Sequence, residues 1–368
     1  MKYEHIELKK FKRSDYSEFV LAGDVGATNA NLSIAGVKGK DVQPLFILHF
    51  MSKELMSISS AINETLKFAD DKYKIHVSKA CLSPAGPLDN GRSFCKLTNN
   101  PLAVDVKVIL SETLLGSLAL INDFEAIGFG LPFLDEKDKS HLIELSHPEK
   151  RVPKAVPKAV KGIVGAGTGL GKSILFFDNV KGMYVPSPSE GGHEDLPVVD
   201  SFEYELMQFV KDRRGGEAPC DYEDLLSGRG IIAIYDYIIE MEMFDYNSVT
   251  DMICKAKDEE KAALISKNAK EDDACMKTFE IFTRFYARAL RNMALNLMAR
   301  GGMYIAGGIA AKNLSFFQDE VFMKEFEINY AQHKVLKEIP VFVITNYNVS
   351  LYGAANVAAN FPELAIKK

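Results

Sequence analysis

Cysteine is scarce in this chain of 368 residues, and the spacing that zinc sites and disulfide frameworks require is missing. The five cysteines are odd in number, and no two of them form a C-x-x-C pair; they are Cys81, Cys95, Cys220, Cys254 and Cys275. Such a pattern suits neither a structural zinc site nor a set of disulfides. We therefore expect reduced thiols that fill core or surface positions, as is typical of a reducing compartment.

Long apolar runs are also missing. No stretch approaches the 18 consecutive apolar residues of a transmembrane helix, so we expect no membrane partner. Residues 1–19 carry many charges but lack the apolar run of a secretory signal. The final residues, Ala-Ile-Lys-Lys, form no recognisable anchor. The prediction is a cytoplasmic protein.

The chain also lacks an excess of positive charge. Lys and Arg number 44 against 50 Asp and Glu, which gives a net charge of −6. Proteins that bind nucleic acid usually show the opposite balance, so no nucleic-acid partner is expected. The 47% hydrophobic and 26% charged composition is that of a globular protein. The length predicts two domains.

Alternating strand and helix patterns predict the α/β class. We expect strands over residues 19–25, 30–37, 77–82, 118–122, 162–164, 173–177 and 303–306. Apolar residues at helical spacing predict helices over residues 57–70 and 273–299, and a third after the strand that ends at residue 122. Gly301 and Gly302 are placed to end the second of these helices.

The segment 134–161 differs from its surroundings. It is polar, contains Pro148, Pro153 and Pro157, and repeats the sequence V-P-K-A-V. We expect an exposed surface excursion here, and a basic docking loop is the alternative.

A strand, a turn with glycine and threonine, and a second strand occur twice, at residues 24–29 and 165–171. A duplicated core with one phosphate-binding turn in each half would produce this echo, and so would coincidence.

The sequence of the second turn nearly matches the P-loop motif. Residues 166–173 read Ala-Gly-Thr-Gly-Leu-Gly-Lys-Ser, so Ala166 replaces the first glycine that the motif requires. A P-loop must also open a helix, whereas Ser173 is followed by the strand-like Ile-Leu-Phe-Phe. The Rossmann fingerprint fails as well. These observations disfavour a P-loop NTPase and leave a glycine hairpin whose backbone amides can hold phosphate.

Six short motifs occur in order between about residues 19 and 355. They are DVGATN, GAGTGLG, Asn122-Asp123-Phe124, Glu190-Gly191-Gly192-His193, Glu223 within EDLLSGRG, and Ala306-Gly307-Gly308-Ile309. Together they resemble the bacterial-type glucokinase family of the hexokinase–actin–Hsp70 superfamily. The C-x-C-G-x-x-G-C zinc signature of the related repressor/open-reading-frame sugar kinases is absent.

The resemblance implies a two-lobed, duplicated ribonuclease-H-like fold of the actin and hexokinase type, with mixed sheets and an active-site cleft between the lobes. The small lobe is then expected to hold residues 1–121, completed by a C-terminal helix in residues 350–368. The large lobe is expected to hold residues 122–349.

The resemblance also implies roles on the sugar side. Asp123 follows an apolar strand and precedes a helix, where an aspartate by itself would be interpreted as a helix N-cap. The family match makes it the general base on the 6-hydroxyl of glucose. The sugar-binding set would be Asn122, Asp123, Glu190, His193 and Glu223, which offer the donors and acceptors that adjacent hydroxyls need. Gly191 and Gly192 are expected to let the chain approach the sugar closely.

On the nucleotide side the resemblance implies ATP and Mg²⁺. Asp24 corresponds to the family's metal-associated aspartate and is expected to hold the ion through water. The residues expected around the phosphates and adenosine are Gly26, Thr28, Asn29, Gly167, Thr168, Gly169, Gly307 and Gly308. Ala27 and Asn31 depart from the usual pattern, which bears on phosphate-donor preference and leaves the reaction type unchanged.

The resulting hypothesis is an ATP-dependent glucokinase that produces glucose 6-phosphate, the first step of glycolysis. It binds glucose and MgATP and is expected to be a homodimer. A kinase for another hexose and a catalytically silent sugar-binding regulator are the alternatives.

Overall fold

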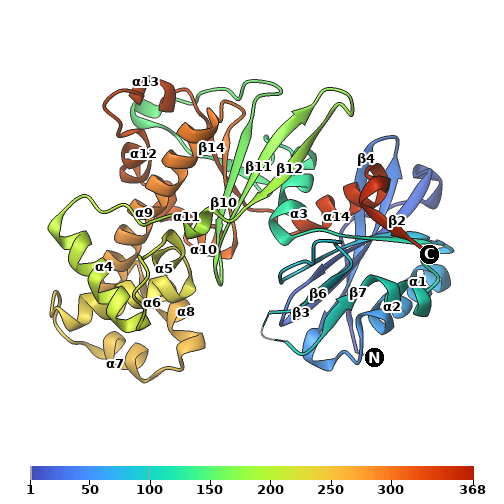
Figure 1. Ribbon diagram of the computed structural model, residues 1–368, viewed down its shortest axis with the longest axis horizontal. Helices are drawn as coiled ribbons and strands as arrows, with labels where there is room; N and C mark the ends of the chain where they lie inside the picture. The colour runs from blue at the N-terminus through green and yellow to red at the C-terminus, as the bar shows by residue number, and fades with distance from the viewer. Residues whose placement is uncertain (1, 99) are drawn as a thin grey trace. The chain divides into compact units, whose positions relative to one another are not determined.

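The computed structural model describes residues 2–98 and 100–368, which form two compact units (Figure 1). The first unit comprises residues 1–135, 184–188 and 346–368, and the second comprises residues 136–183 and 189–345. Each unit is built on one large mixed sheet. The α/β class expected from the sequence is confirmed.

The sheet of the first unit has seven strands in the order β1-β4-β3-β2-β5-β8-β15. Their bounds are Glu4–Glu7 (β1), Glu18–Val25 (β2), Asn29–Lys38 (β3), Asp41–Met51 (β4), Lys79–Pro84 (β5), Ser117–Leu120 (β8) and Ala365–Lys367 (β15). β2, β5 and β8 run parallel, so their carboxyl ends lie at one edge of the sheet. Phe94–Lys96 (β6) and Ala103–Asp105 (β7) form a separate hairpin.

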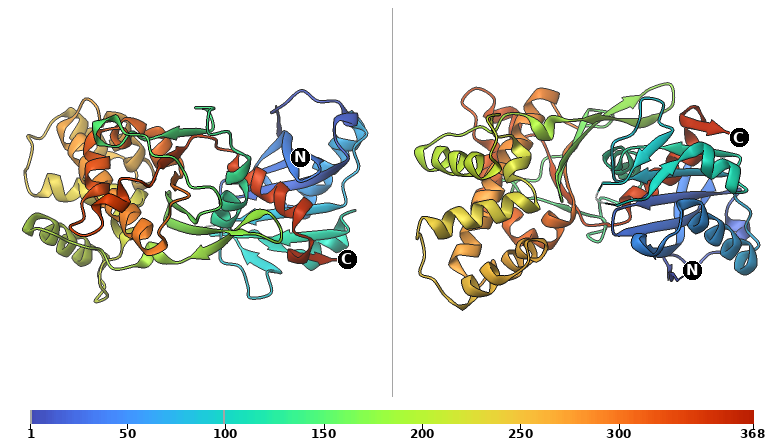
Figure 2. Two further views of the ribbon diagram at one scale, coloured as in Figure 1. Left: turned by 90° about the horizontal axis from the view of Figure 1, so that it is seen from above. Right: turned by 60° about the horizontal axis from the view of Figure 1, so that its bottom comes forward.

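The helices of this unit are Ile58–Tyr73 (α1), Val106–Glu112 (α2), Asp123–Gly130 (α3) and Val349–Asn360 (α14). α1 begins where the Ser57 hydroxyl accepts the Ser60 N–H, and it ends at Lys74 in the left-handed conformation. α14 is buried along most of its length and contacts β2, β4 and β5. Figure 2 shows this red helix against the blue and teal strands.

α3 belongs with the first unit, although the expected lobe boundary placed residues 122–135 in the other lobe. It packs on α14, where the Asn356 amide donates to the Phe129 carbonyl at 3.0 Å. The rings of Phe129 and Phe361 lie 4.8 Å apart, centroid to centroid. These buried contacts tie the helix after β8 to the C-terminal helix.

The sheet of the second unit has six strands in the order β12-β11-β10-β13-β14-β9. Their bounds are Leu142–Glu144 (β9), Lys161–Ala166 (β10), Leu170–Asp178 (β11), Met183–Ser189 (β12), Met303–Ala306 (β13) and Val341–Ile344 (β14). Residues 184–188 of β12 are grouped with the first unit, although the strand pairs in this sheet. β10, β13 and β14 run parallel, and β11 pairs antiparallel with β10.

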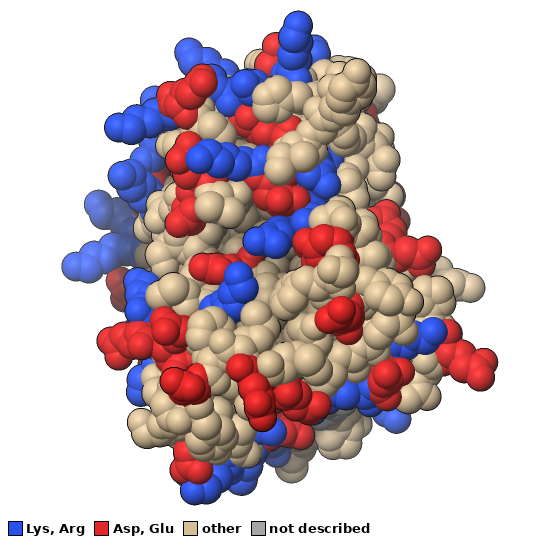
Figure 3. All heavy atoms as spheres, turned by 90° about the vertical axis from the view of Figure 1, so that its left-hand side faces the viewer, with Lys and Arg blue, Asp and Glu red and all other residues tan. Residues whose placement is uncertain are grey.

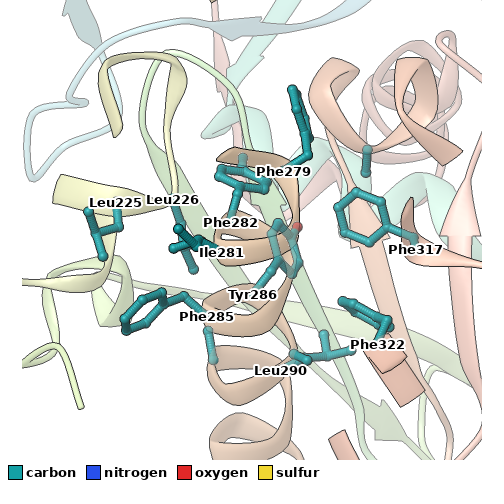
Figure 4. Close-up of a cluster of buried hydrophobic side chains, with 14 of the residues drawn as sticks. Leu225, Leu226, Phe279, Ile281, Phe282, Phe285, Tyr286, Leu290, Phe317 and Phe322 are labelled. Carbon is teal, nitrogen blue, oxygen red and sulfur yellow. The ribbon is translucent and has the colours of Figure 1, made fainter. Parts of the chain in front are cut away.

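The longest helix of the second unit is Asp273–Leu297 (α9), and several of the other helices pack on it. The others are Ser201–Arg214 (α4), Tyr222–Leu225 (α5), Gly228–Glu240 (α6), Ser248–Lys255 (α7), Asp258–Asn268 (α8), Gly308–Lys312 (α10), Leu314–Phe317 (α11), Glu320–Glu327 (α12) and His333–Leu336 (α13). Phe279, Phe282 and Tyr286 of α9 are fully buried and pack with Phe317 and Phe322 (Figure 4). This aromatic cluster forms much of the core of the unit.

The two sheets repeat one topology. In the first sheet the order is β4-β3-β2-β5-β8-β15. β3 pairs antiparallel with β2 on one side, the parallel strands β5 and β8 follow on the other side, and β15 is antiparallel at the edge. In the second, β12-β11-β10-β13-β14-β9 follows the same pattern. The echo of residues 24–29 in residues 165–171 therefore reflects a duplicated fold, with β1 as an addition.

The prediction that residues 134–161 form an exposed surface excursion holds for most of the segment and is wrong for residues 142–147. β9 lies in this segment and pairs antiparallel with β14. Leu142, Leu145 and His147 are buried. Polar residues outnumber apolar ones in the segment, and the single strand is too short to show alternation in the sequence. Among residues 2–98 and 100–368, no helix is both long and apolar enough to span a bilayer.

Candidate active site

The turn between β2 and β3 is a compact hairpin whose backbone is held from outside. The Gly26 N–H donates to the Asn29 carbonyl at 2.8 Å. The Ser52 hydroxyl donates to the Gly26 carbonyl at 2.7 Å, and the Asn100 amide donates to the Ala27 carbonyl, also at 2.7 Å. These hydrogen bonds fix the backbone of the turn. Thr28 and Asn29 at its tip are exposed.

Asp24 lies just before this turn and is half-buried. The Ser350 hydroxyl of α14 donates to its Oδ2 at 2.8 Å. Burial raises the pKa of Asp24, the Ser350 hydrogen bond opposes that rise, and the negative charge of Asp123 adds to it. Two carboxylates that repel one another at a strand edge are suited to a cation.

Asn122 and Asp123 begin α3. The Asn122 side chain caps the helix by accepting the N–H groups of Phe124, at 2.8 Å, and Glu125, at 3.4 Å. The N-cap role that an isolated aspartate would suggest for position 123 therefore belongs to Asn122. Asp123 occupies the first turn of the helix, where the positive end of the helix dipole favours an ionised carboxylate.

The strand topology brings Asp24 and Asp123 to the same edge. The Ala85 N–H donates to the Val25 carbonyl at 2.9 Å, and the Ile121 N–H donates to the Leu82 carbonyl at 3.1 Å. The chain therefore leaves β2, β5 and β8 in register, and ligands of open α/β sheets bind outside these carboxyl ends.

In the second unit, the turn between β10 and β11 is held by Glu223. The Glu223 Oε2 accepts the Leu170 N–H at 2.9 Å, and its Oε1 accepts a hydrogen bond from Arg229 at 3.0 Å. The Gly167 N–H donates to the Gly169 carbonyl at 2.8 Å, and Gly167 and Thr168 are exposed. Glu223 thus joins the glycine turn to the start of α5.

Glu190 precedes a short 3₁₀ turn, Gly191–His193, and His193 is its last residue; both side chains are exposed. The Nδ1 of His193 lies 2.9 Å from Oδ2 of Asp221, which fixes the imidazole. This hydrogen bond raises the pKa of His193, and the charges of Glu223 and Glu190 act in the same direction. Glu190, His193 and Glu223 are therefore close enough to interact electrostatically.

Two of the glycines serve packing within the second unit. A Cβ on Gly192 would overlap the Leu170 carbonyl, so the packing against β11 requires glycine at this position. Gly307 has a φ of 92°, and a Cβ at this position would overlap the Ala166 carbonyl. Glycine therefore allows the end of β13 to pack closely against the end of β10. Gly308 has open space where a Cβ would be.

Lys172 does not occupy a P-loop. It lies inside β11 with only 2% of its side chain exposed, and its ammonium pairs with Glu194 at 2.7 Å. The ammonium also lies 5.0 Å from the centroid of the Tyr222 ring. Because β11 continues as a strand after Ser173, the geometry agrees with the rejection of a P-loop.

The comparisons with known proteins match this chain to glucokinases. The family profile described as glucokinase matches residues 21–361. The glucokinase of Nostoc punctiforme is 32% identical over 351 residues, which cover 92% of this chain and 98% of that protein. The glucokinase of Tolumonas auensis is 31% identical over 338 residues, with 92% and 96% covered.

The chain belongs to the glucokinase family. Solved structures share its fold. A glucokinase from an Antarctic psychrotroph superposes with a TM-score of 0.75 at 24% identity, over 93% of this chain and 99% of that one. The glucokinase of Balamuthia mandrillaris in complex with glucose gives 0.71 at 22% identity, over 93% of each chain. The duplicated actin and hexokinase-type fold expected from the motifs is confirmed.

Whether this glucokinase-family chain can hold Mg²⁺ depends on the oxygen ligands that its side chains offer. Within residues 2–98 and 100–368, no group of three or more His, Cys, Asp or Glu side chains is arranged to hold a metal ion. Mg²⁺ commonly uses one or two carboxylates together with waters and substrate phosphates. Asp24, with one oxygen bonded to Ser350 and Asp123 nearby, fits that mode.

Several supporting residues were missed by the sequence reasoning. Arg92 and Ser350 contact Glu125 and Asp24 from distant positions in the chain, and Asp221 contacts His193. Of these contacts, only the role of Glu125 could have been predicted from the sequence, because a glutamate three residues after Asn122 is the signature of a capping box.

Proposed function

We propose that this chain transfers the γ-phosphoryl group of ATP to the 6-hydroxyl of glucose and releases glucose 6-phosphate. The observation that carries the proposal is the family match over residues 21–361, with Asp123 held in the first turn of α3. The family is one of phosphotransferases with an alcohol acceptor, and a nucleotide is the phosphoryl donor.

Asp123 is proposed as the general base. The 6-hydroxyl must lose its proton as its oxygen bonds to the γ-phosphorus and the bond to the β-phosphate oxygen breaks. A carboxylate within hydrogen-bonding distance can take that proton. Asn122 keeps Asp123 at the start of the helix, because its side chain caps the helix.

The proposed sugar contacts are Asn122, Asp123, Glu190, His193 and Glu223. The Nδ1 of His193 donates to Asp221, which leaves Nε2 for a sugar hydroxyl. Each carboxylate oxygen of Glu223 accepts one hydrogen bond from the protein and has a second lone pair for a hydroxyl. A site built from such groups discriminates against sugars that lack the matching hydroxyl.

Backbone amides are proposed to hold the phosphates. Gly26, Thr28 and Asn29 in one turn, and Gly167, Thr168 and Gly169 in the other, carry N–H groups suited to anions. Gly307 and Gly308 would leave room for adenosine. When bound, Mg²⁺ would neutralise charge on the phosphates, and Asp24 would hold it through a carboxylate oxygen or a water.

A coupled assay with ATP across glucose, mannose, fructose, N-acetylglucosamine and glucosamine tests the function. We expect turnover on glucose to exceed turnover on the other sugars. Preference for a different hexose would replace glucose as the substrate and keep the reaction. Absence of turnover on every sugar would contradict the kinase and favour a sugar-binding regulator.

Two further expectations, a homodimer and a cytoplasmic location, remain predictions. Light scattering at several protein concentrations tests the first, and imaging of a tagged chain in its own cell tests the second.

A further inference from the structure

A cationic cavity of about 720 Å³ lies in the second unit, where two segments far apart in the sequence meet. One segment is residues 151–156, inside the stretch with the V-P-K-A-V repeat, and the other is residues 334–338. Five of the lining side chains are cationic and one is acidic: Arg151, Lys154, Arg300, Lys334, Lys337 and Glu338. The net charge of these six residues is therefore +4, against −6 for the whole chain.

Most of this positive charge is not neutralised by the protein. The ammonium groups of Lys154, Lys334 and Lys337 form no ion pair within residues 2–98 and 100–368. Arg151 pairs with the buried Glu327 at 2.7 Å, and Arg300 pairs with Glu338 at 3.7 Å between two substantially exposed side chains. Three of the five cations therefore remain unpaired in the described part of the chain. Like charges gathered at one concavity repel one another, so a bound anion would relieve a cost that the free protein bears. Figure 3 shows blue Lys and Arg side chains gathered in the upper left part of the pictured face.

The walls of the cavity are fixed by hydrogen bonds. Arg151 donates from Nη1 to the Lys337 carbonyl at 3.1 Å and from Nη2 to Oε1 of the buried Glu327 at 2.7 Å. The Val156 N–H donates to the Arg300 carbonyl at 2.8 Å. Because these bonds already hold residues 151–156 against Lys337 and Arg300, an anion would meet a site that needs little further ordering.

The shape and the lining select a class of ligand. The volume lies within the range of about 300–1,000 Å³ that small-molecule sites occupy. Val152 and Val156 are half exposed beside the lysines and offer apolar contact to a ring. A hollow between two short segments suits a compact anion, whereas duplex nucleic acid binds along an extended basic surface.

We propose that this cavity binds a small phosphorylated molecule that carries at least two negative charges, such as a sugar phosphate or a nucleotide. Lys154, Lys334 and Lys337 supply the charge that recognises the phosphoryl group, and Val152 and Val156 contact the organic part. The site is separate from the residues proposed for phosphoryl transfer, so it does not depend on the function proposed above.

Inorganic pyrophosphate is the probe, and calorimetric titration without Mg²⁺ on the full chain is the measurement. The K154Q/K334Q/K337Q variant removes three charges from the cavity. The matched control, K257Q/K267Q/K270Q, removes three exposed lysines from α8 and its two flanks. We expect the cavity variant to bind pyrophosphate at least tenfold more weakly than the unchanged chain, and the control to bind it as the unchanged chain does. Equal affinity in all three proteins would overturn the proposal, since the probe would then bind at the phosphate turns instead.

Two further measurements separate this proposal from its rivals. Both triple variants should keep the turnover of the unchanged chain, and the pyrophosphate result stands even if no sugar is phosphorylated. Single-stranded RNA and vesicles containing phosphatidylserine are titrated in parallel. If either binds through the three lysines while pyrophosphate does not, the cavity recognises a macromolecule or a membrane, and the small-molecule proposal is wrong.

Discussion

Arg92 donates two hydrogen bonds to Glu125, from Nη1 to Oε2 at 3.1 Å and from Nη2 to Oε1 at 2.8 Å. The same Oε2 accepts the Asn122 N–H at 2.9 Å. Glu125 has 4% of its side chain exposed, and Arg92 adopts a positive φ of 49°. This paired carboxylate therefore fixes the start of α3, where Asn122 and Asp123 lie.

Glu125→Gln should reduce both stability and turnover. The amide keeps the shape and one acceptor but loses the charge that both Arg92 bonds use, so the free energy of unfolding should fall by about 1–3 kcal/mol. Turnover should fall about tenfold or more because the start of α3 shifts. Urea unfolding and the coupled assay measure the two effects. The exposed Glu112→Gln is the control, and unchanged turnover in Glu125→Gln would remove Glu125 as a positioning residue.

Asp123→Asn should abolish most of the chemistry while preserving sugar binding. The amide cannot accept the proton of the 6-hydroxyl, so kcat should fall by about 10²- to 10⁴-fold. Calorimetric titration with glucose should give nearly the same affinity. The exposed Asp71→Asn should behave as the unchanged chain. Near-normal turnover in Asp123→Asn would eliminate it as the base.

Ser350→Ala should shift the pH dependence of turnover. Burial raises the pKa of Asp24, and the Ser350 hydrogen bond is the main opposing influence. Without it the pKa of Asp24 rises further, so the acidic limb of kcat/KM should move to higher pH. Ser350→Thr keeps the hydroxyl and should retain the original profile. An unmoved limb in the alanine variant would show that the ionisation of Asp24 does not control turnover.

Asp221→Asn should lower the pKa of His193. The hydrogen bond to Asp221 is the largest cause of the raised pKa, and the amide removes its charge. Because the folded pKa lies above the unfolded one, the associated stability is present at low pH and is lost as pH rises through the folded value. The effect on stability should be small, since the His193 side chain is 53% exposed. NMR titration of the imidazole measures the shift, with His76 as an internal reference.

The sequence predicted the elements whose pattern is local. The strand that contains Asp24, the helix Asp273–Leu297 and the hairpin at residues 165–171 all have apolar periodicity or turn residues within a short window. The candidate site residues followed from six ordered motifs, and their roles remain predictions. The structure places Asp24 at the end of β2, Asn122 and Asp123 at the start of α3, Glu223 in α5, and the remaining residues at turns or at the start of α10.

The features that the sequence did not predict depend on distant partners. Arg92 pairs with a residue 33 positions away and Ser350 with one 326 positions away, so neither pairing has a local signature. The burial within residues 142–147 was not predicted for the same reason, since His147 forms hydrogen bonds with Glu327 at 2.6 Å and with the Ile339 carbonyl at 3.0 Å. Burial of a polar segment depends on the partners it finds.

The edge strands of the two sheets have a consequence for synthesis. The chain from β2 through β8 and α3 continues into β9, which pairs in the second sheet, and the chain from β10 through β14 and α14 continues into β15, which pairs in the first. Ala365 pairs with Ala119, 246 positions earlier (365 − 119). The first sheet consequently has an open edge at β8 until almost the whole chain has left the ribosome. The second sheet, by contrast, is complete once β14 has been synthesised, so the second sheet can form before the first is complete, although domains generally fold in order from the N-terminus during synthesis.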